Sequence, residues 1–198
     1  MECTELRSRL LYQQGDTGLC LLTAQELNGS YPSWLCQEEV NQHNAHWQRP
    51  SSLKQVSQFV DSLTDDASKL VFAVYAMQDS VHIGNVSLQS IDHLNQCAEL
   101  AFLFGDTQYW GQGYATQAAR LVIIHAFKHL NLNRIYLGCL KKNIAMNKLA
   151  IKLGFSHEGL RRQALFNDGA LQDVVEYGLL KNESATSKII NKDAAFNT

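Results

Sequence analysis

The stretch from Glu99 to Phe127 constrains the fold more than any other part of the sequence. It predicts an apolar strand over roughly Glu99 to Phe104, a turn that contains Gly111 and Gly113, and then a long amphipathic helix. The strand is apolar on both faces, as a central buried strand should be. Apolar side chains recur in the helix at i, i+3, i+4 and i+7, which indicates one buried face: Ala115, Ala118, Ala119, Val122, Ile123, Ala126 and Phe127. This order of elements favours a mixed α/β domain.

Gly111 and Gly113 lie where the helix is expected to begin. The first four N–H groups of a helix have no internal partners, and the helix dipole adds partial positive charge there. Glycine carries no Cβ, so a bulky anion can approach the backbone. The turn therefore predicts a phosphate or pyrophosphate site, with a plain helix start as the alternative. The chain lacks the G-x-x-x-x-G-K-S/T motif of P-loops, and the G-x-G-x-x-G motif of dinucleotide folds is incomplete.

Two motifs resemble a known family. Gln108-x-x-Gly111-x-Gly113-Tyr114-Ala115 is similar to the Q/R-x-x-G-x-G/A signature of the GNAT N-acetyltransferases, and Asn143 to Phe155 resembles the family's N-x-x-A/S…K-L-G-F segment. With the flanking strands, the resemblance covers about residues 18 to 180 and is closest to the amino-sugar and ribosomal-protein N-terminal branch. It implies the GNAT fold: a central twisted mixed sheet of about six or seven strands, helices on both faces and a V-shaped cofactor cleft.

The resemblance also implies acetyl-CoA as cosubstrate. Its pyrophosphate would bind the amides of the glycine turn, and its pantetheine arm would bond to exposed strand backbone as an added strand does. For Asn143, a plain helix N-cap is the alternative interpretation. The implied cofactor-binding residues are Phe102, Leu103, Phe104, Gln108, Gly111, Gln112, Gly113, Tyr114, Ala115, Thr116, Asn143 and Asn147.

Glu99 is the one charge on the apolar strand. A carboxylate there is costly unless it is paired, hydrogen-bonded or near solvent, and burial would raise its pKa toward working pH. The resemblance favours Glu99 as the general base over a structural ion pair. Many family members carry a tyrosine that protonates the departing thiolate at the position of Ala150, so the usual general acid is missing.

The acceptor is defined less well. The resemblance implies that Tyr31 to Trp47 and the hairpin around Asn167-Asp168-Gly169 form walls of the acceptor pocket, with ordinary packing as the alternative. The substrate-binding candidates are Trp34, Glu39, Phe166 and Tyr177. The predicted function is direct transfer of an acetyl group to a primary amine of a small molecule, with a nucleotide-linked amino sugar favoured. Alternatives are ribosomal-type N-terminal, polyamine or antibiotic acetylation, and, from another class, a non-catalytic acetyl-CoA-binding regulatory module.

Length, charge and composition restrict the number of domains and the possible partners. With 198 residues and 45% apolar content, we expect one domain over residues 1–181 and a polar tail over residues 182–198. A net charge of −2 favours no nucleic-acid partner, and no apolar run reaches the ~18 residues that span a membrane. The start of the chain does not look like a signal peptide. Five cysteines without C-x-x-C and histidines without H-E-x-x-H predict no metal and favour the cytoplasm. The expected assembly is a monomer or homodimer.

Overall fold

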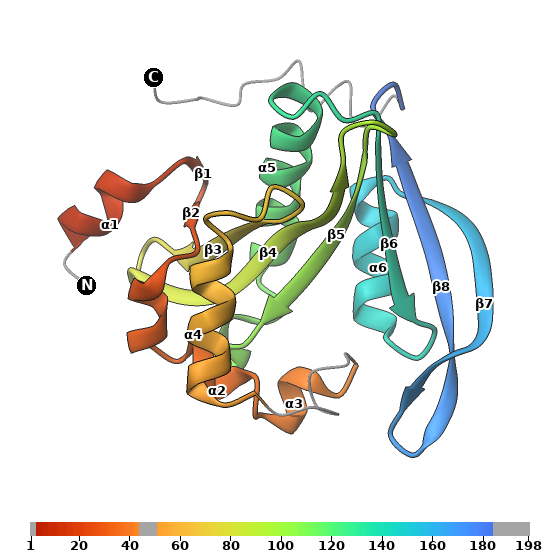
Figure 1. Ribbon diagram of the computed structural model, residues 1–198, viewed down its shortest axis with the longest axis horizontal. Helices are drawn as coiled ribbons and strands as arrows, with labels where there is room; N and C mark the ends of the chain where they lie inside the picture. Colours follow the sequence, from red (N-terminus) through yellow and green to blue (C-terminus); the bar gives the residue numbers. More distant parts are fainter. Residues whose placement is uncertain (1–2, 44–50, 184–198) are drawn as a thin grey trace.

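The computed structural model describes residues 3–43 and 51–183. It has a mixed α/β fold around an eight-stranded sheet of order β1-β2-β3-β4-β5-β6-β8-β7 (Figure 1). The expectation of six or seven strands was slightly low. The difference arises at the N-terminal edge, where β1 (Tyr12–Gln14) and β2 (Thr17–Leu21) form separate antiparallel strands. Gly15, with φ +58°, makes the tight turn between them possible.

The next three strands form an antiparallel meander: β3 (Leu70–Ala76), β4 (Val81–Asp92) and β5 (Cys97–Phe104). Alternate side chains of β3 enter two different cores. Phe72 and Val74 join the core on one face, whereas Ala73 and Tyr75 join the core on the other. Because the strand is buried on both faces, its sequence is a continuous apolar run.

Helices cover both faces of the sheet (Figure 1). One face carries α5 (Tyr114–Lys128) and α6 (Ile144–Leu153), whose apolar sides pack into the larger core. The opposite face of the first strands is covered by elements from the N-terminal part of the chain: α1 (Cys3–Arg9), η1 (Ala24–Asn28), α2 (Tyr31–Trp34) and α4 (Leu53–Ser62). A short helix, α3 (Glu38–Asn41), follows α2.

The remaining strands are β6 (Arg134–Leu140), β7 (Ser156–Asn167) and β8 (Ala170–Leu180). The pairing of β5 with β6 is parallel and consists of three residue pairs, the last being Glu99 with Tyr136. By contrast, β6 pairs with β8 along its whole length. Beyond Glu99 the two strands therefore separate, which gives the V-shaped opening that the family resemblance implies.

Local sequence explains several helix ends. Ser52 caps α4 in a capping box with Gln55, Asn143 accepts a hydrogen bond from the Met146 N–H at the start of α6, and Gly154 ends α6 with φ +91°. Thr23 forms a capping box with Glu26, and the helix that follows is 3-10. The helix α1 was not anticipated. Residues 44–47 of the predicted acceptor wall and residues 184–198 of the predicted tail lie outside the described part of the chain.

A buried carboxylate fastens α1 to the sheet. Glu26 is 2% exposed and accepts hydrogen bonds from the guanidinium of Arg9, the hydroxyl of Tyr75 and the backbone N–H of Thr23. Burial alone would raise the pKa of Glu26, but these donors outweigh it and hold that pKa below its usual value. Its contribution to stability is therefore complete above the unfolded-state pKa and is lost as the pH falls through the lower folded-state pKa.

We expect Glu26→Gln to lower the free energy of unfolding by about 3 kcal/mol at neutral pH, because removing one partner of a buried pair leaves the other uncompensated. Urea denaturation measures this change. Glu158→Gln is the matched control. Its ion pair with Arg134 has side chains that are 34% and 38% exposed, so the loss should stay below about 1 kcal/mol. Equal losses in the two variants would contradict this account.

Candidate active site

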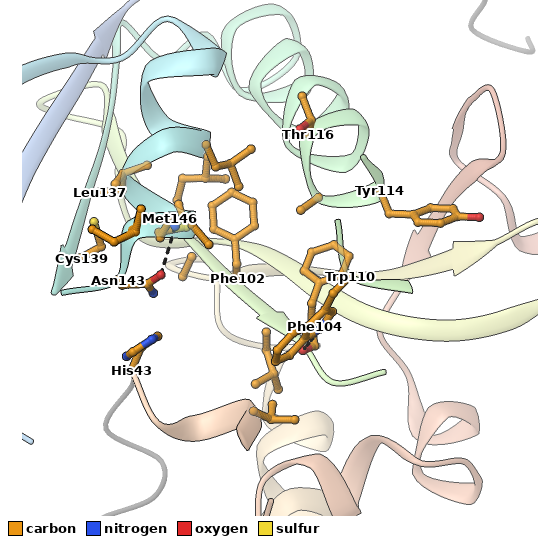
Figure 2. A pocket seen from close by; sticks show the side chains of 18 of the residues that line it. His43, Phe102, Phe104, Trp110, Tyr114, Thr116, Leu137, Cys139, Asn143 and Met146 are labelled. Carbon is orange, nitrogen blue, oxygen red and sulfur yellow. Dashed lines mark hydrogen bonds between the residues drawn. The ribbon is translucent and has the colours of Figure 1, made fainter. Parts of the chain in front are cut away.

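The opening between β5 and β6 is a cleft with a volume of about 800 Å³ (Figure 2). One wall is formed by residues 99–104 of β5 and the other by residues 137–139 of β6. The first turns of α5 and α6 contribute further lining residues, and residues from α3 to His43 reach the cleft from the N-terminal part of the chain. The cleft thus joins the two sequence motifs, which are distant in the chain.

The loop of residues 105–113 forms one end of the cleft. Gly111 and Gly113 have φ of +74° and +95°, a conformation that side chains other than glycine rarely adopt. A Cβ built on either glycine would meet no atom within 4 Å, so the space beside the loop is free for a ligand. Tyr114, Ala115 and Thr116 follow in the first turn of α5, line the same cleft and carry N–H groups without intrahelical partners. The geometry fits a bulky anion such as a pyrophosphate.

The middle of the cleft suits an extended ligand. Because β5 has no strand partner on its β6 side beyond Glu99, the backbone of residues 100–104 is open along that edge. Phe102, Leu137 and Met146 project into the same space and make it apolar (Figure 2). A ligand with alternating amide and methylene groups can bond to this edge and pack against these side chains.

Glu99 lies at the point where the strands separate. Its neighbours Ala98 and Leu100 are buried in the core beneath α5, so the Glu99 side chain points to the opposite face of the sheet. Burial raises the pKa of Glu99, the carboxylate of Glu176 raises it further, and the guanidinium of Arg161 opposes them. A carboxyl group with a raised pKa beside a cleft is suited to accept a proton near neutral pH.

A salt bridge lies near Glu99, on the face of the sheet opposite α5. The Arg161 Nε donates to an oxygen of Glu176 at 2.5 Å. Between Glu176 and Glu99 the sheet carries Gly138, which is exposed and lines the cleft. A Cβ on Gly138 would meet the Glu176 carboxylate at 3.1 Å and the Arg161 guanidinium at 3.5 Å, so the salt bridge lies over this glycine.

Two polar side chains approach from α3 and the turn after it. Glu39 is exposed and lines the cleft, as the acceptor-wall prediction requires. His43 projects toward the cavity (Figure 2), and its Nδ1 is buried without a hydrogen-bond partner among the described residues. Burial and the nearby Lys142 ammonium lower the pKa of His43, and the backbone of Gln42 opposes this shift. His43 is therefore largely neutral at pH 7.

Other predicted cofactor residues lie outside the lining of the cleft. The side chain of Gln112 donates to the backbone carbonyl of Gln108, and both residues are exposed. The Asn147 amide donates to the backbone carbonyls of Asn143 and Leu140 and accepts from the hydroxyl of Tyr177. Asn147 and Tyr177 thus hold α6 against β6 and β8.

Two of the predicted acceptor residues also lie away from the cleft lining. Trp34 is 2% exposed, and its indole packs so closely on Gly105 that a Cβ there would overlap the ring. Trp34 therefore has the packing role that was the alternative interpretation. Phe166 is 54% exposed near the tip of the β7–β8 hairpin.

Several lining residues were not among the predicted site residues. They come mainly from β6, from the turn after it and from the loop before α5: Leu137, Gly138, Cys139, Lys142, Lys152, Tyr109 and Trp110. The strand at residues 134–140 was recognised, and the predicted splay could have identified its cleft-facing residues. Burial raises the pKa of Cys139 to about 11, with a further contribution from Glu176, so this thiol is protonated at neutral pH.

Within residues 3–43 and 51–183, no cluster of three or more histidine, cysteine or acidic side chains could hold a metal ion. The same ranges contain no helix long and apolar enough to cross a membrane.

The sequence is similar to a known family model and to several proteins of named activity. The family model described as an acetyltransferase (GNAT) domain matches residues 18–156. The spermidine N(1)-acetyltransferase of Escherichia coli is 30% identical over 65% of this chain and 68% of its own length. A ribosomal-protein-serine acetyltransferase of the same organism is 35% identical over 48% of this chain, which spans 52% of that relative.

A solved structure shares the fold. The spermidine N-acetyltransferase of Vibrio cholerae, in complex with CoA and spermine, aligns with a TM-score of 0.78 over 90% of this chain and 100% of its own. Its sequence is 23% identical.

We expect Gly113→Ala to weaken CoA binding at least tenfold, because its Cβ would occupy the ligand space and a non-glycine residue disfavours this φ by about 1–2 kcal/mol. Isothermal titration with CoA measures the affinity. Gly169→Ala, in the β7–β8 turn, is the matched control, since it has φ +73° and equally open space. It should lose similar stability and keep its CoA affinity. A similar loss of CoA affinity in both variants would mean that backbone strain, and not lost ligand space, weakens binding.

Proposed function

Since the chain belongs to the GNAT acetyltransferase family, and is thus an acetyl-CoA-dependent N-acetyltransferase, we propose that its acceptor is a small cationic amine of the polyamine class. The observation that carries this proposal is the position of Glu99, a carboxyl group with a raised pKa at the point where β5 and β6 separate. Glu39 adds a second carboxylate to the cleft. Negative charge at this end favours an acceptor that is positively charged at neutral pH.

In the proposed binding mode, Gly111, Gly113 and the first N–H groups of α5 hold the pyrophosphate of acetyl-CoA. The open backbone of residues 102–104 holds the pantetheine arm. Lys142 also lines the cleft, but it lies near His43 and 4.0 Å from a carboxylate oxygen of Asp168, on the side of the predicted acceptor walls. In this mode the anionic cosubstrate is held by backbone N–H groups and the positive end of the α5 dipole.

Acetyl-CoA supplies the acetyl group as a thioester. The protein brings the amine beside it, which converts a bimolecular reaction into one between oriented groups. Glu99, directly or through a water molecule, accepts the proton that the ammonium loses, and a free backbone N–H of β5 donates to the thioester carbonyl oxygen. Because the Cys139 thiol is protonated at neutral pH, the proposed route is direct attack without an acyl-enzyme.

The usual tyrosine acid has no counterpart here, since Ala150 is fully buried in the core. Tyr177 and Tyr114 have their hydroxyls bonded to Asn147 and Asp16. A CoA thiolate is a good leaving group, so the reaction does not require a general acid.

The named relatives favour the alternatives over the amino sugar that the sequence suggested. One is a spermidine acetyltransferase, which supports the polyamine class. The other acetylates a serine of a ribosomal protein according to its name, so a protein N-terminal amine is the second candidate. That residues 1–181 form one catalytic domain and act as a monomer or homodimer stays a prediction.

The experiment that tests the acceptor class follows release of free CoA thiol with a panel of amines. The panel contains spermidine, spermine, aminoglycosides, peptides with N-terminal serine or alanine, and UDP- and dTDP-linked amino sugars. We expect the highest kcat/KM with a polyamine. A clear preference for the peptides would transfer the assignment to the N-terminal class, and a preference for a nucleotide-linked sugar would overturn the cationic-acceptor argument.

We expect Glu99→Gln to lower kcat/KM by about 10²- to 10⁴-fold, the range typical of a lost general base. In the wild-type enzyme, kcat/KM should fall as the pH drops through the raised pKa of Glu99, and this acidic limb should vanish in the variant. In Glu176→Gln the limb should move to lower pH, because that carboxylate raises the Glu99 pKa. Full activity of Glu99→Gln at every pH would remove the base assignment.

A further inference from the structure

Two tyrosines, one on each side of Gly111 and Gly113, bind the loop to the β1–β2 and β3–β4 turns. The Tyr109 hydroxyl donates to an oxygen of Asp79 at 2.8 Å, and the Tyr114 hydroxyl donates to an oxygen of Asp16 at 2.5 Å. Both tyrosines line the cleft, and their rings pack edge to face with centroids 5.6 Å apart. Figure 2 shows the Tyr114 ring directed away from the cavity, so its hydroxyl is not turned toward a ligand there.

Asp16 connects three parts of the protein. It lies in the β1–β2 turn, and its second carboxylate oxygen accepts the backbone N–H of Gln78, while its carbonyl accepts the N–H of Met77. Gln78 and Met77 belong to the β3–β4 turn, which also carries Asp79. These two hydrogen bonds join Asp16 to the turn that carries Asp79, so the two aspartates belong to one hydrogen-bonded support.

The two aspartates place carboxylates near a predicted anion site. Carboxylates beside an anion site would be expected to repel the anion. Here each carboxylate accepts a phenol proton, so a neutral ring stands between the charge and the loop. The hydrogen bond to Asp16 and burial raise the pKa of Tyr114 to about 12, and the bond to Asp79 is the main cause that raises the pKa of Tyr109. Both phenols therefore remain protonated donors at neutral pH.

We propose that Asp16 and Asp79 are positioning residues, which hold the glycine loop in its ligand-ready shape through Tyr114 and Tyr109. The proposal rests on the proposed role of this loop in binding the pyrophosphate. Gly111 and Gly113 give the loop access to an anion but also leave it conformationally free. Fixing Tyr109 and Tyr114, one on each side of the two glycines, reduces that freedom before binding, so less ordering entropy is lost when the cosubstrate binds.

The test compares two acetyl donors in Tyr109→Phe, Tyr114→Phe and the double variant. Acetyl-CoA carries the pyrophosphate, whereas S-acetylpantetheine carries the same thioester and pantetheine arm without it. We expect KM for acetyl-CoA to rise about tenfold in the double variant with kcat within twofold, because lost preorganisation weakens binding and leaves the reacting groups in place. KM for S-acetylpantetheine should not change.

Tyr12→Phe is the matched control. It also removes a tyrosine hydroxyl that is hydrogen-bonded at 2.6 Å, here to the Nδ1 of His125, on a part of the sheet that does not line the cleft. It should lower the melting temperature and leave both KM values unchanged. A purely structural role of Tyr109 and Tyr114 would make the double variant behave in the same way, or would lower the rates with both donors equally, and either result overturns the proposal.

The donors also separate failure of this proposal from failure of the site assignment. If the wild-type enzyme uses S-acetylpantetheine as efficiently as acetyl-CoA, the loop does not bind the pyrophosphate and the underlying assignment is wrong. If the wild type strongly prefers acetyl-CoA and the double variant keeps that preference, the loop assignment stands and the positioning role of the two aspartates is wrong.

Discussion

The structure depends on one incomplete pairing of two strands. β5 and β6 form three residue pairs and then diverge, although each remains paired along its other edge, with β4 and β8 respectively. The divergence leaves a row of backbone groups unpaired at the centre of the molecule, where such groups are normally satisfied. It also opens the space into which the loop before α5 and the first turn of α6 both face. The binding cleft is therefore a consequence of sheet geometry, and the side chains refine it.

Charged side chains of both signs line this cleft. Glu99 and Glu39 contribute carboxylates and Lys142 and Lys152 contribute ammonium groups, while Arg161 pairs with Glu176 and opposes its effect on the pKa of Glu99. The N-terminal helices pack on the first strands, and Glu99 is half-buried where it lines the cleft. A proton acceptor of raised pKa thus lies beside the cleft that an amine would enter.

Most of the fold could be predicted from the sequence because its signals are local. Asn143, Ser52 and Gly154 act within one helical turn, and the apolar periodicity of α5 needs no distant contact to be recognised. The contacts of other predicted site residues depend on distant partners. Trp34 appeared suitable for an acceptor wall, but its environment is set by Gly105, and Asn147 is engaged by Tyr177, 30 residues later in the chain. No local pattern indicated that Asp16 binds Tyr114, which lies 98 residues away.

The short β5–β6 contact also has a thermodynamic consequence. Within the sheet itself, three residue pairs join the strands β1 to β5 to the strands β6 to β8, so the sheet consists of two halves with a narrow connection. A ligand bonded to the free edge of β5 and packed against β6 and α6 completes that connection from within. Ligand binding and separation of the two halves are then thermodynamically linked. The free energy that the ligand gains by contacting both halves is the amount by which it makes their separation less favourable.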